Sequence, residues 1–123
     1  MDTDRARVLV IEDDTDIREA VVEYLQDEGY DVTSAENGAD ALRRLGEGPL
    51  PGVVLLDATM PVLDGAGTLA CLRANPAWAN IPVVMSSADA RMHELDADRH
   101  LMKPFSVSDL VATLKELLEA PAR

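Results

Sequence analysis

The sequence predicts an α/β protein in which helices cover both faces of a doubly wound, five-stranded parallel sheet. Short apolar segments rich in β-branched residues alternate with segments of helical periodicity. The apolar segments are nearly continuous, as in strands buried on both faces. Only 3% of the 123 residues are aromatic, so the core is aliphatic, which suits helices packed on a sheet. At this length we expect a single domain spanning residues 1–123.

Five segments are predicted to be the strands. Each is short, apolar or β-branched, and bounded by turn or charged residues. They are RVLVIE (7–12), DVTSA (31–35), GVVLLD (52–57), IPVVMSS (81–87) and RHLMK (99–103).

Four segments between and after these strands are predicted to be helices. The first has apolar residues at helical spacing from Ile17 to Leu25, and Gly29 follows where a left-handed terminal residue is favoured. The last has a strong apolar stripe over 107–118, preceded by a pattern that resembles a capping box. Weaker patterns cover 37–48 and 64–76.

Cys71 lies in the predicted helix over 64–76 and is the single cysteine of the sequence. It therefore excludes an intramolecular disulfide and a cysteine metal cluster. We expect it to be a small core residue of that helix.

The charge of the chain limits its partners and its location. Asp and Glu number 23 against 11 Lys and Arg, and a net charge of -12 repels nucleic acid and anionic membrane surfaces. The sequence lacks a charged-then-apolar leader and an apolar run long enough to span a membrane. We therefore expect a cytoplasmic protein that binds neither nucleic acid nor membrane.

Polar residues follow the predicted strands at the points where the strands end. Because the carboxyl ends of parallel strands meet at one edge of a sheet, we expect these residues to converge there. Carboxylate oxygens are the ligands that Mg²⁺ prefers, whereas the glycine-rich loop that cradles a nucleotide is missing after the first strand. The residues are Glu12, Asp13 and Asp14, then Asp57, then Ser86 and Ser87, and finally Lys103.

Asp57 stands at the end of the most apolar of these segments, VVLLD. A carboxylate there is costly unless a nearby group compensates its charge. It can also act as a nucleophile toward phosphorus and form an aspartyl phosphate, provided that cations neutralise the phosphoryl oxygens. Mg²⁺, Lys103 and a serine hydroxyl would provide that stabilisation.

Four motifs together resemble the response-regulator receiver domain of two-component signalling. They are VLVIEDD, LLDATMPVLDG, IPVVMSSA and HLMKPF, and they occur along the whole chain in the order of that family. The resemblance implies a chemotaxis-regulator-like fold with the flavodoxin-like strand order 2-1-3-4-5. It also implies a cis peptide bond between Lys103 and Pro104.

The same resemblance implies a role for each site residue. Asp57 would be the phosphoacceptor, and Ser87 and Lys103 would contact the phosphoryl group. Mg²⁺ would be held by Asp13, Asp14, Asp57 and the main-chain carbonyl of Thr59.

The function implied is a phosphorylation-activated signalling switch. It would accept its phosphoryl group from a histidine kinase or a phosphotransfer protein, and the output would be changed binding to a downstream protein partner. It would not be an enzyme beyond self-catalysed phosphoryl transfer to Asp57 and autodephosphorylation.

Several alternatives remain open at this point. Asp13 or Asp14 could cap the first helix, since Asp is a favoured N-cap residue. Ser86 competes with Ser87, although strand parity favours Ser87. A degenerate receiver that binds a partner without phosphorylation, or a small phosphohydrolase with the same nucleophile, would use a similar sheet. Such hydrolases usually carry a second acid two residues after the nucleophile, where this chain has Thr59.

The chain departs from the family in one region. The interval from Ser87 to Lys103 is shorter than in most receivers, so we expect a shortened fourth helix or a partly ordered loop within 88–98. By the resemblance, His100 occupies the place of the Tyr or Phe that usually moves with the serine, which predicts a weakened or replaced switch; the alternative is a His that is simply solvated on an edge strand. Neither His93 nor His100 has partners at metal-ligand spacing.

Overall fold

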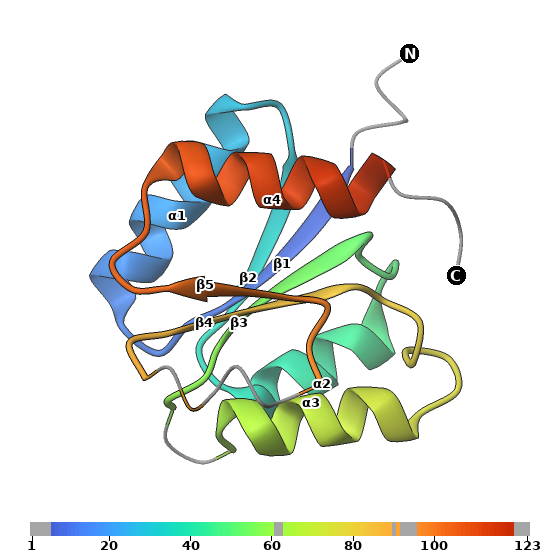
Figure 1. The fold of residues 1–123 in the computed structure, drawn as a ribbon. Helices are drawn as coiled ribbons and strands as arrows, with labels where there is room; N and C mark the ends of the chain where they lie inside the picture. Colours follow the sequence, from blue (N-terminus) through green and yellow to red (C-terminus); the bar gives the residue numbers. More distant parts are fainter. Residues whose placement is uncertain (1–5, 61–62, 90, 92–95, 120–123) are drawn as a thin grey trace.

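A computed structural model describes residues 6–60, 63–89, 91 and 96–119 of the chain. Its centre is a five-stranded sheet in the order β2-β1-β3-β4-β5 (Figure 1). Neighbouring strands all pair in parallel. The predicted fold class and strand order are confirmed. The strands are β1 (Arg7–Ile11), β2 (Asp31–Ala35), β3 (Val53–Asp57), β4 (Val83–Ser87) and β5 (Arg99–Met102).

Two helices cover each face of the sheet, as Figure 1 shows, so the described chain forms three layers. Side chains of α2 and α3 pack in one buried cluster, and side chains of α1 and α4 pack in the other. The helices are α1 (Thr15–Asp27), α2 (Gly38–Glu47), α3 (Gly65–Ala74) and α4 (Val107–Glu119).

The central strands alternate between the two clusters. In β1, Val8 and Val10 belong to the cluster under α1 and α4, whereas Leu9 and Ile11 belong to the cluster under α2 and α3. Every residue of β3 and of β4 is buried. This double burial explains why these segments read as continuous apolar runs rather than as alternating patterns.

The ends of α1 follow the sequence signals. The side chain of Asp14 accepts a hydrogen bond from the backbone N–H of Ile17 at 3.0 Å and caps the helix. Gly29 has φ of +96°, a left-handed conformation that favours glycine because it has no Cβ. The predicted stop at Gly29 is confirmed.

The cap predicted for the last helix is present in part. The Ser106 hydroxyl accepts a hydrogen bond from the Asp109 N–H at 3.0 Å, at the start of α4. This bond satisfies one of the backbone donors that the first turn of a helix leaves unpaired.

The expectation that Cys71 is a core residue is wrong, because its side chain is exposed. The buried positions of α3 are Gly65, Thr68, Leu69 and Leu72. These positions follow helical spacing and place Cys71 outside the buried face.

The segment between β4 and β5 carried two further predictions. The short helix expected within 88–98 falls mostly on residues 90 and 92–95, which lie outside the described residues. The Lys103–Pro104 peptide bond is cis, as the resemblance implies. Among the described residues, no helix is both long and apolar enough to cross a membrane.

Candidate functional site

Three carboxylates gather at the carboxyl ends of β1 and β3. Oxygen atoms of Glu12, Asp13 and Asp57 all lie within 4.8 Å of one another. Asp57 is the last residue of β3, and Glu12 continues β1 because its N–H donates to the carbonyl of Ala35 at 3.1 Å. Glu12 and Asp57 are buried, whereas Asp13 is exposed. Convergence of this kind is what the ends of adjacent parallel strands produce.

Lys103 brings a cation to the two buried carboxylates. Its Nζ donates to Asp57 Oδ1 at 3.1 Å and to Glu12 Oε1 at 3.3 Å. The lysine follows β5 directly, and its backbone N–H donates to the carbonyl of Ser87 at 2.9 Å. The strand pairing of β4 with β5 therefore positions the ammonium group against Asp57.

Burial changes the ionisation of Glu12. Desolvation, supported by the hydrogen bond and negative charge of Asp57, raises the pKa of Glu12 to about 7, although the Asp14 backbone N–H and Lys103 act against it. Burial by itself would lower the pKa of Lys103, but hydrogen bonds and charge from Asp57 and Glu12 outweigh burial and raise it. The lysine stays charged, and the site still holds more acid than base. A divalent cation would compensate that excess.

The structure places Asp14, a predicted metal ligand, outside the carboxylate cluster, and its metal-binding role stays a prediction. The carboxylate of Asp14 is exposed and caps α1 through the Ile17 N–H, while its own backbone N–H donates to Glu12 Oε2 at 3.2 Å. Glu12 takes the place in the carboxylate cluster that the sequence analysis gave to Asp14. The physical reason is that the Glu12 N–H is still bonded to the neighbouring strand β2, whereas Asp14 already caps α1, so Glu12 lies at the sheet edge and the Asp14 carboxylate does not.

The two candidate serines, Ser86 and Ser87, are the last two residues of β4. Ser87 is the last residue of β4, and its Oγ accepts from the Asp89 N–H at 2.8 Å and donates to the Asp89 carbonyl at 3.3 Å. Ser86 pairs in register with Asp57, and its carbonyl accepts from the Ala58 N–H at 2.9 Å. The role of Ser87 toward a phosphoryl group stays a prediction.

The remaining predicted site residues are Thr59, which follows β3, and His100, which lies on β5. The N–H of Thr59 donates to Asp57 Oδ1 at 3.3 Å, which orients that carboxylate. His100 lies on β5 in register with Met85 and is half-buried. The metal-binding role of the Thr59 carbonyl and the switch role of His100 both stay predictions.

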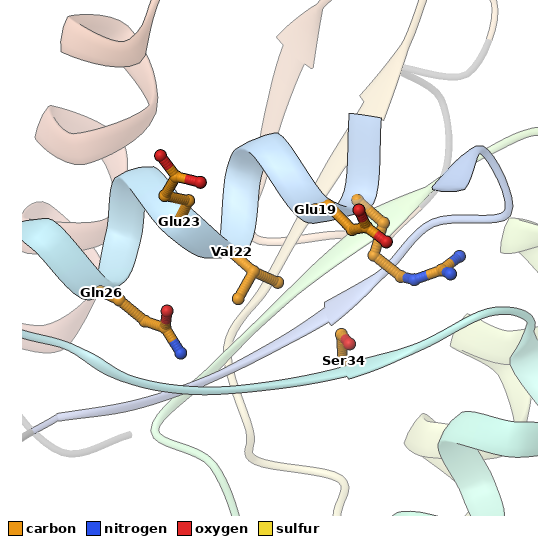
Figure 2. Close-up of a pocket in the computed structure, with 6 residues that line it drawn as sticks. Glu19, Val22, Glu23, Gln26 and Ser34 are labelled. Atoms are coloured by element: carbon orange, nitrogen blue, oxygen red, sulfur yellow. The ribbon is translucent and has the colours of Figure 1, made fainter. Parts of the chain in front are cut away.

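Two hollows near α1 differ in character. Figure 2 shows a pocket of about 380 Å³ between α1 and β2, which contains none of the three clustered carboxylates and is lined by Arg18, Glu19, Val22, Glu23, Gln26 and Ser34. An apolar groove of about 490 Å³ lies between α1 and the start of α4, and Lys103 forms part of its wall. The groove, rather than the pocket of Figure 2, is therefore continuous with the acidic site.

Comparison with known proteins identifies the family. The family described as response regulator receiver domain matches residues 8–115. The chain belongs to this family.

Similar proteins carry this domain in longer and in shorter chains. The receiver is 41% identical over 118 residues to the transcriptional regulatory protein PrrA of Mycobacterium leprae, covering 91% of this chain and 49% of PrrA. It is 35% identical over 119 residues to the protein PilG of Pseudomonas aeruginosa, covering 92% and 87% of the two chains. The receiver thus spans about half the length of PrrA and its relatives.

A solved structure relates the fold to the chemistry. The response regulator TrrA from Thermotoga maritima, in complex with Mg²⁺ and BeF, matches with a TM-score of 0.82 and 30% identity over 91% of this chain and 98% of that chain. Receiver domains are phosphorylation-activated signalling switches rather than classical enzymes, and this chain is such a domain. The cluster of Glu12, Asp13 and Asp57 fits Mg²⁺, because it offers three oxygen ligands within 4.8 Å of one another.

Proposed function

We propose that Asp57 accepts a phosphoryl group from a histidine kinase or a phosphotransfer protein and that the phosphorylated receiver changes its binding to a downstream protein. One observation carries this assignment. Asp57 is buried at the centre of the sheet edge, with an ammonium group 3.1 Å from its Oδ1 and two further carboxylates beside it. This combination of a nucleophile, a cation and a metal-ligand set is what phosphoryl transfer to a carboxylate requires.

The reaction would proceed by attack of a carboxylate oxygen of Asp57 on phosphorus, while the bond from phosphorus to the donor nitrogen or oxygen breaks. Lys103 is placed to pair with a phosphoryl oxygen. Bound Mg²⁺ would neutralise the negative charge that gathers on the phosphoryl oxygens. Glu12, Asp13 and Asp57 are the side chains proposed to hold it, together with the main-chain carbonyl of Thr59.

We propose that the phosphodonor contacts the apolar groove beside the site. Ile17 and Tyr24 on its α1 wall are 42% and 50% exposed, so they offer apolar surface to a docked protein. Lys103, which follows β5, also lines the groove and contacts Asp57, so a protein docked in the groove would be adjacent to Asp57. The net charge of -12 supports a protein partner rather than nucleic acid, and cytoplasmic location remains our proposal.

The proposed output begins at Ser87. Its hydroxyl is bonded to the backbone of Asp89, so recruitment by a phosphoryl group on Asp57 would break those bonds and release the start of the β4–β5 connection. His100, on the neighbouring strand, is the proposed second switch residue. Because a half-buried imidazole is more polar than Tyr or Phe, we expect a smaller inward movement than an aromatic ring would give.

Incubation with acetyl phosphate and Mg²⁺, followed by intact-mass measurement, tests the proposal. We expect one added phosphoryl group on the wild type and none on Asp57→Asn. Asp64→Asn is a matched control, because Asp64 is a carboxylate that caps α3 through the Gly67 N–H and does not belong to the cluster. A wild type that takes up no phosphoryl group would support the alternative of a phosphorylation-independent binding module.

The same experiment separates a switch from a phosphohydrolase. A hydrolase would release phosphate continuously from acetyl phosphate or another phosphomonoester. The receiver should instead accumulate the phosphorylated form. Lys103→Ala should still fold, yet its NMR spectrum should change less than that of the wild type on binding beryllofluoride.

A further inference from the structure

The guanidinium group of Arg73, near the end of α3, joins three separate segments. Its Nη1 donates to the carbonyls of Ala79 and Ile81, both at 3.1 Å, in the loop between α3 and β4. Its Nη2 donates to the carbonyl of Asp96 at 3.3 Å and to Asp98 Oδ2 at 2.9 Å, in the connection that leads into β5. One side chain therefore links α3 to the entrances of two strands.

Asp98 completes this arrangement. Its side chain is only 2% exposed, and the Oδ2 that binds Arg73 also accepts from the Val83 N–H at 2.7 Å. The Asp98 N–H in turn donates to the Val83 carbonyl at 2.9 Å. The residue before β5 is thereby fixed to the first residue of β4. We call Arg73, Asp98 and their bonds the Arg73–Asp98 clamp.

The strand that follows the clamp is held less firmly than the central strands. β5 is an edge strand of four residues that pairs with β4, and none of the four is fully buried, although Leu101 packs against the cluster under α1 and α4. Residues 88–98, an 11-residue connection, join it to β4. Burial therefore specifies the register of β5 less strongly than that of β3 and β4, in which every residue is buried.

The register of β5 determines where Lys103 lies. The pairing of Ser87 with Met102 allows the Lys103 N–H to bind the Ser87 carbonyl at 2.9 Å. If β5 slipped by two residues relative to β4, its side chains would still point to the same faces of the sheet. Lys103 would move by roughly 6–7 Å along the strand direction. The 3.1 Å contact of its Nζ with Asp57 would then be lost.

We propose that Arg73 and Asp98 are positioning residues, which hold β5 in the register that places Lys103 against Asp57. The clamp acts at the amino end of β5, and the lysine follows its carboxyl end. This inference rests on the proposed function, because it assigns Lys103 to the phosphoryl site. The clamp differs from a purely stabilising ion pair, because its effect on phosphorylation depends on the position of Lys103.

Two mild substitutions test this, because Arg73→Ala carries a risk of not folding. Asp98→Asn removes the charge and keeps the shape, and Arg73→Lys keeps the charge and loses the planar guanidinium that reaches four acceptors. We expect each to slow phosphorylation by acetyl phosphate and Mg²⁺ about tenfold or more, since small misplacements of a catalytic group have effects of this size. Circular dichroism establishes that the rates belong to folded protein.

A double-mutant cycle distinguishes positioning from stability. In a Lys103→Ala background, Asp98→Asn should slow phosphorylation by less than about twofold, because the group that the clamp positions is absent. Arg99→Gln is the matched control, since Arg99 begins β5 and forms an exposed pair with Glu116. Its rate should equal that of the wild type. Rates of the clamp variants near wild type, or an undiminished loss in the Lys103→Ala background, would overturn the proposal.

Hydrogen exchange in the wild type provides a test that needs no variant. If the clamp holds β5, the amides of Val83, Asp98 and Lys103 should open together and show similar protection. Much faster exchange at Val83 and Asp98 than at Lys103 would overturn the proposal. A wild type that takes up no phosphoryl group would refute the proposed function instead, and the exchange pattern would still decide whether the clamp holds the strand.

Discussion

Two groups of buried charges lie at opposite ends of β5, and they are built differently. In the Arg73–Asp98 clamp, one acid faces one base, and Arg73 also donates to three backbone carbonyls while the Asp98 carboxylate accepts from the Val83 N–H. At the other end, the ammonium group of Lys103 binds the carboxylates of Glu12 and Asp57, and a third carboxylate, that of Asp13, lies beside these two. The first group is balanced in charge, and the second is not.

This difference distinguishes a buried pair that the protein itself neutralises from a site whose charge the protein leaves uncompensated. A buried pair is stable only when its geometry and its additional hydrogen bonds repay the loss of hydration, and the clamp meets both conditions. The acidic site does not, so Glu12 has a pKa of about 7 and is partly protonated at neutral pH. Negative charge that the protein leaves uncompensated in this way favours the binding of a cation.

The largest effect should come from breaking the balanced pair. Arg73→Ala leaves the Asp98 carboxylate buried without its cation, and we expect a loss of about 3–5 kcal/mol in the free energy of unfolding. Lys103→Ala should cost less, because Glu12 can take up a proton when the cation is removed. Urea unfolding at pH 7 measures both. A larger loss in Lys103→Ala than in Arg73→Ala would contradict the comparison.

The sequence predicted the fold but not the clamp, for a physical reason. Strand order and layering follow from apolar runs, periodicity and a family resemblance, all of which are local or linear signals. Arg73 and Asp98 are 25 residues apart and belong to no repeating pattern. Two opposite charges at that separation can be predicted to pair only when the fold is known to place α3 beside the first residue of β5.

The position of the carboxylate cluster could be predicted from the sequence, but the choice among the three consecutive acids could not be made from composition. Three consecutive acids follow the first strand, and composition alone cannot tell which of them faces the sheet edge. The available signal was the start of the apolar helical stripe at Ile17, since an N-cap residue precedes such a stripe by about three residues. That spacing selects Asp14 as the cap and leaves Glu12 and Asp13 for the site.

The next effect concerns pH and Glu12. Its pKa of about 7 in the folded protein exceeds the ordinary value of 4.5, so the folded state binds more protons between these values. The free energy of unfolding should therefore fall as pH rises from about 4.5 to 7, by an amount on the order of 3 kcal/mol in the absence of Mg²⁺. Glu12→Gln, which cannot ionise, should remove this slope. Urea unfolding at several pH values measures it.

Mg²⁺ provides the complementary measurement for Glu12. The metal competes with the proton on this carboxyl group, so binding should tighten by about tenfold between pH 6 and pH 8. Calorimetric titration of the wild type and Glu12→Gln measures the difference, and the variant should bind more weakly with a flatter pH dependence. Equal Mg²⁺ affinity in both proteins would exclude Glu12 from the metal site.

A smaller effect should come from Asp14, which is adjacent to the acidic cluster without belonging to it. Asp14→Ala removes the N-cap of α1, so we expect a loss of about 1 kcal/mol in the free energy of unfolding. Mg²⁺ affinity should change little, whereas Asp13→Ala should weaken it clearly. Denaturant unfolding and calorimetry on the two variants measure these effects. A strong loss of Mg²⁺ affinity in Asp14→Ala would instead support Asp14 as a metal ligand, as the sequence analysis predicted.

The smallest effect should come from the exposed pair beside the clamp. Arg99 and Glu116 join β5 to α4, but their side chains are 47% and 58% exposed. Water and salt screen such a pair, and we expect Arg99→Gln to change the free energy of unfolding by less than about 0.5 kcal/mol. Asp98 is the preceding residue and its side chain is buried, so the two substitutions differ in burial rather than in position. Thermal unfolding at low and high salt should show a small loss that disappears with salt for Arg99→Gln and a larger, salt-insensitive loss for Asp98→Asn. Equal losses would mean that burial does not distinguish the clamp from an ordinary surface pair.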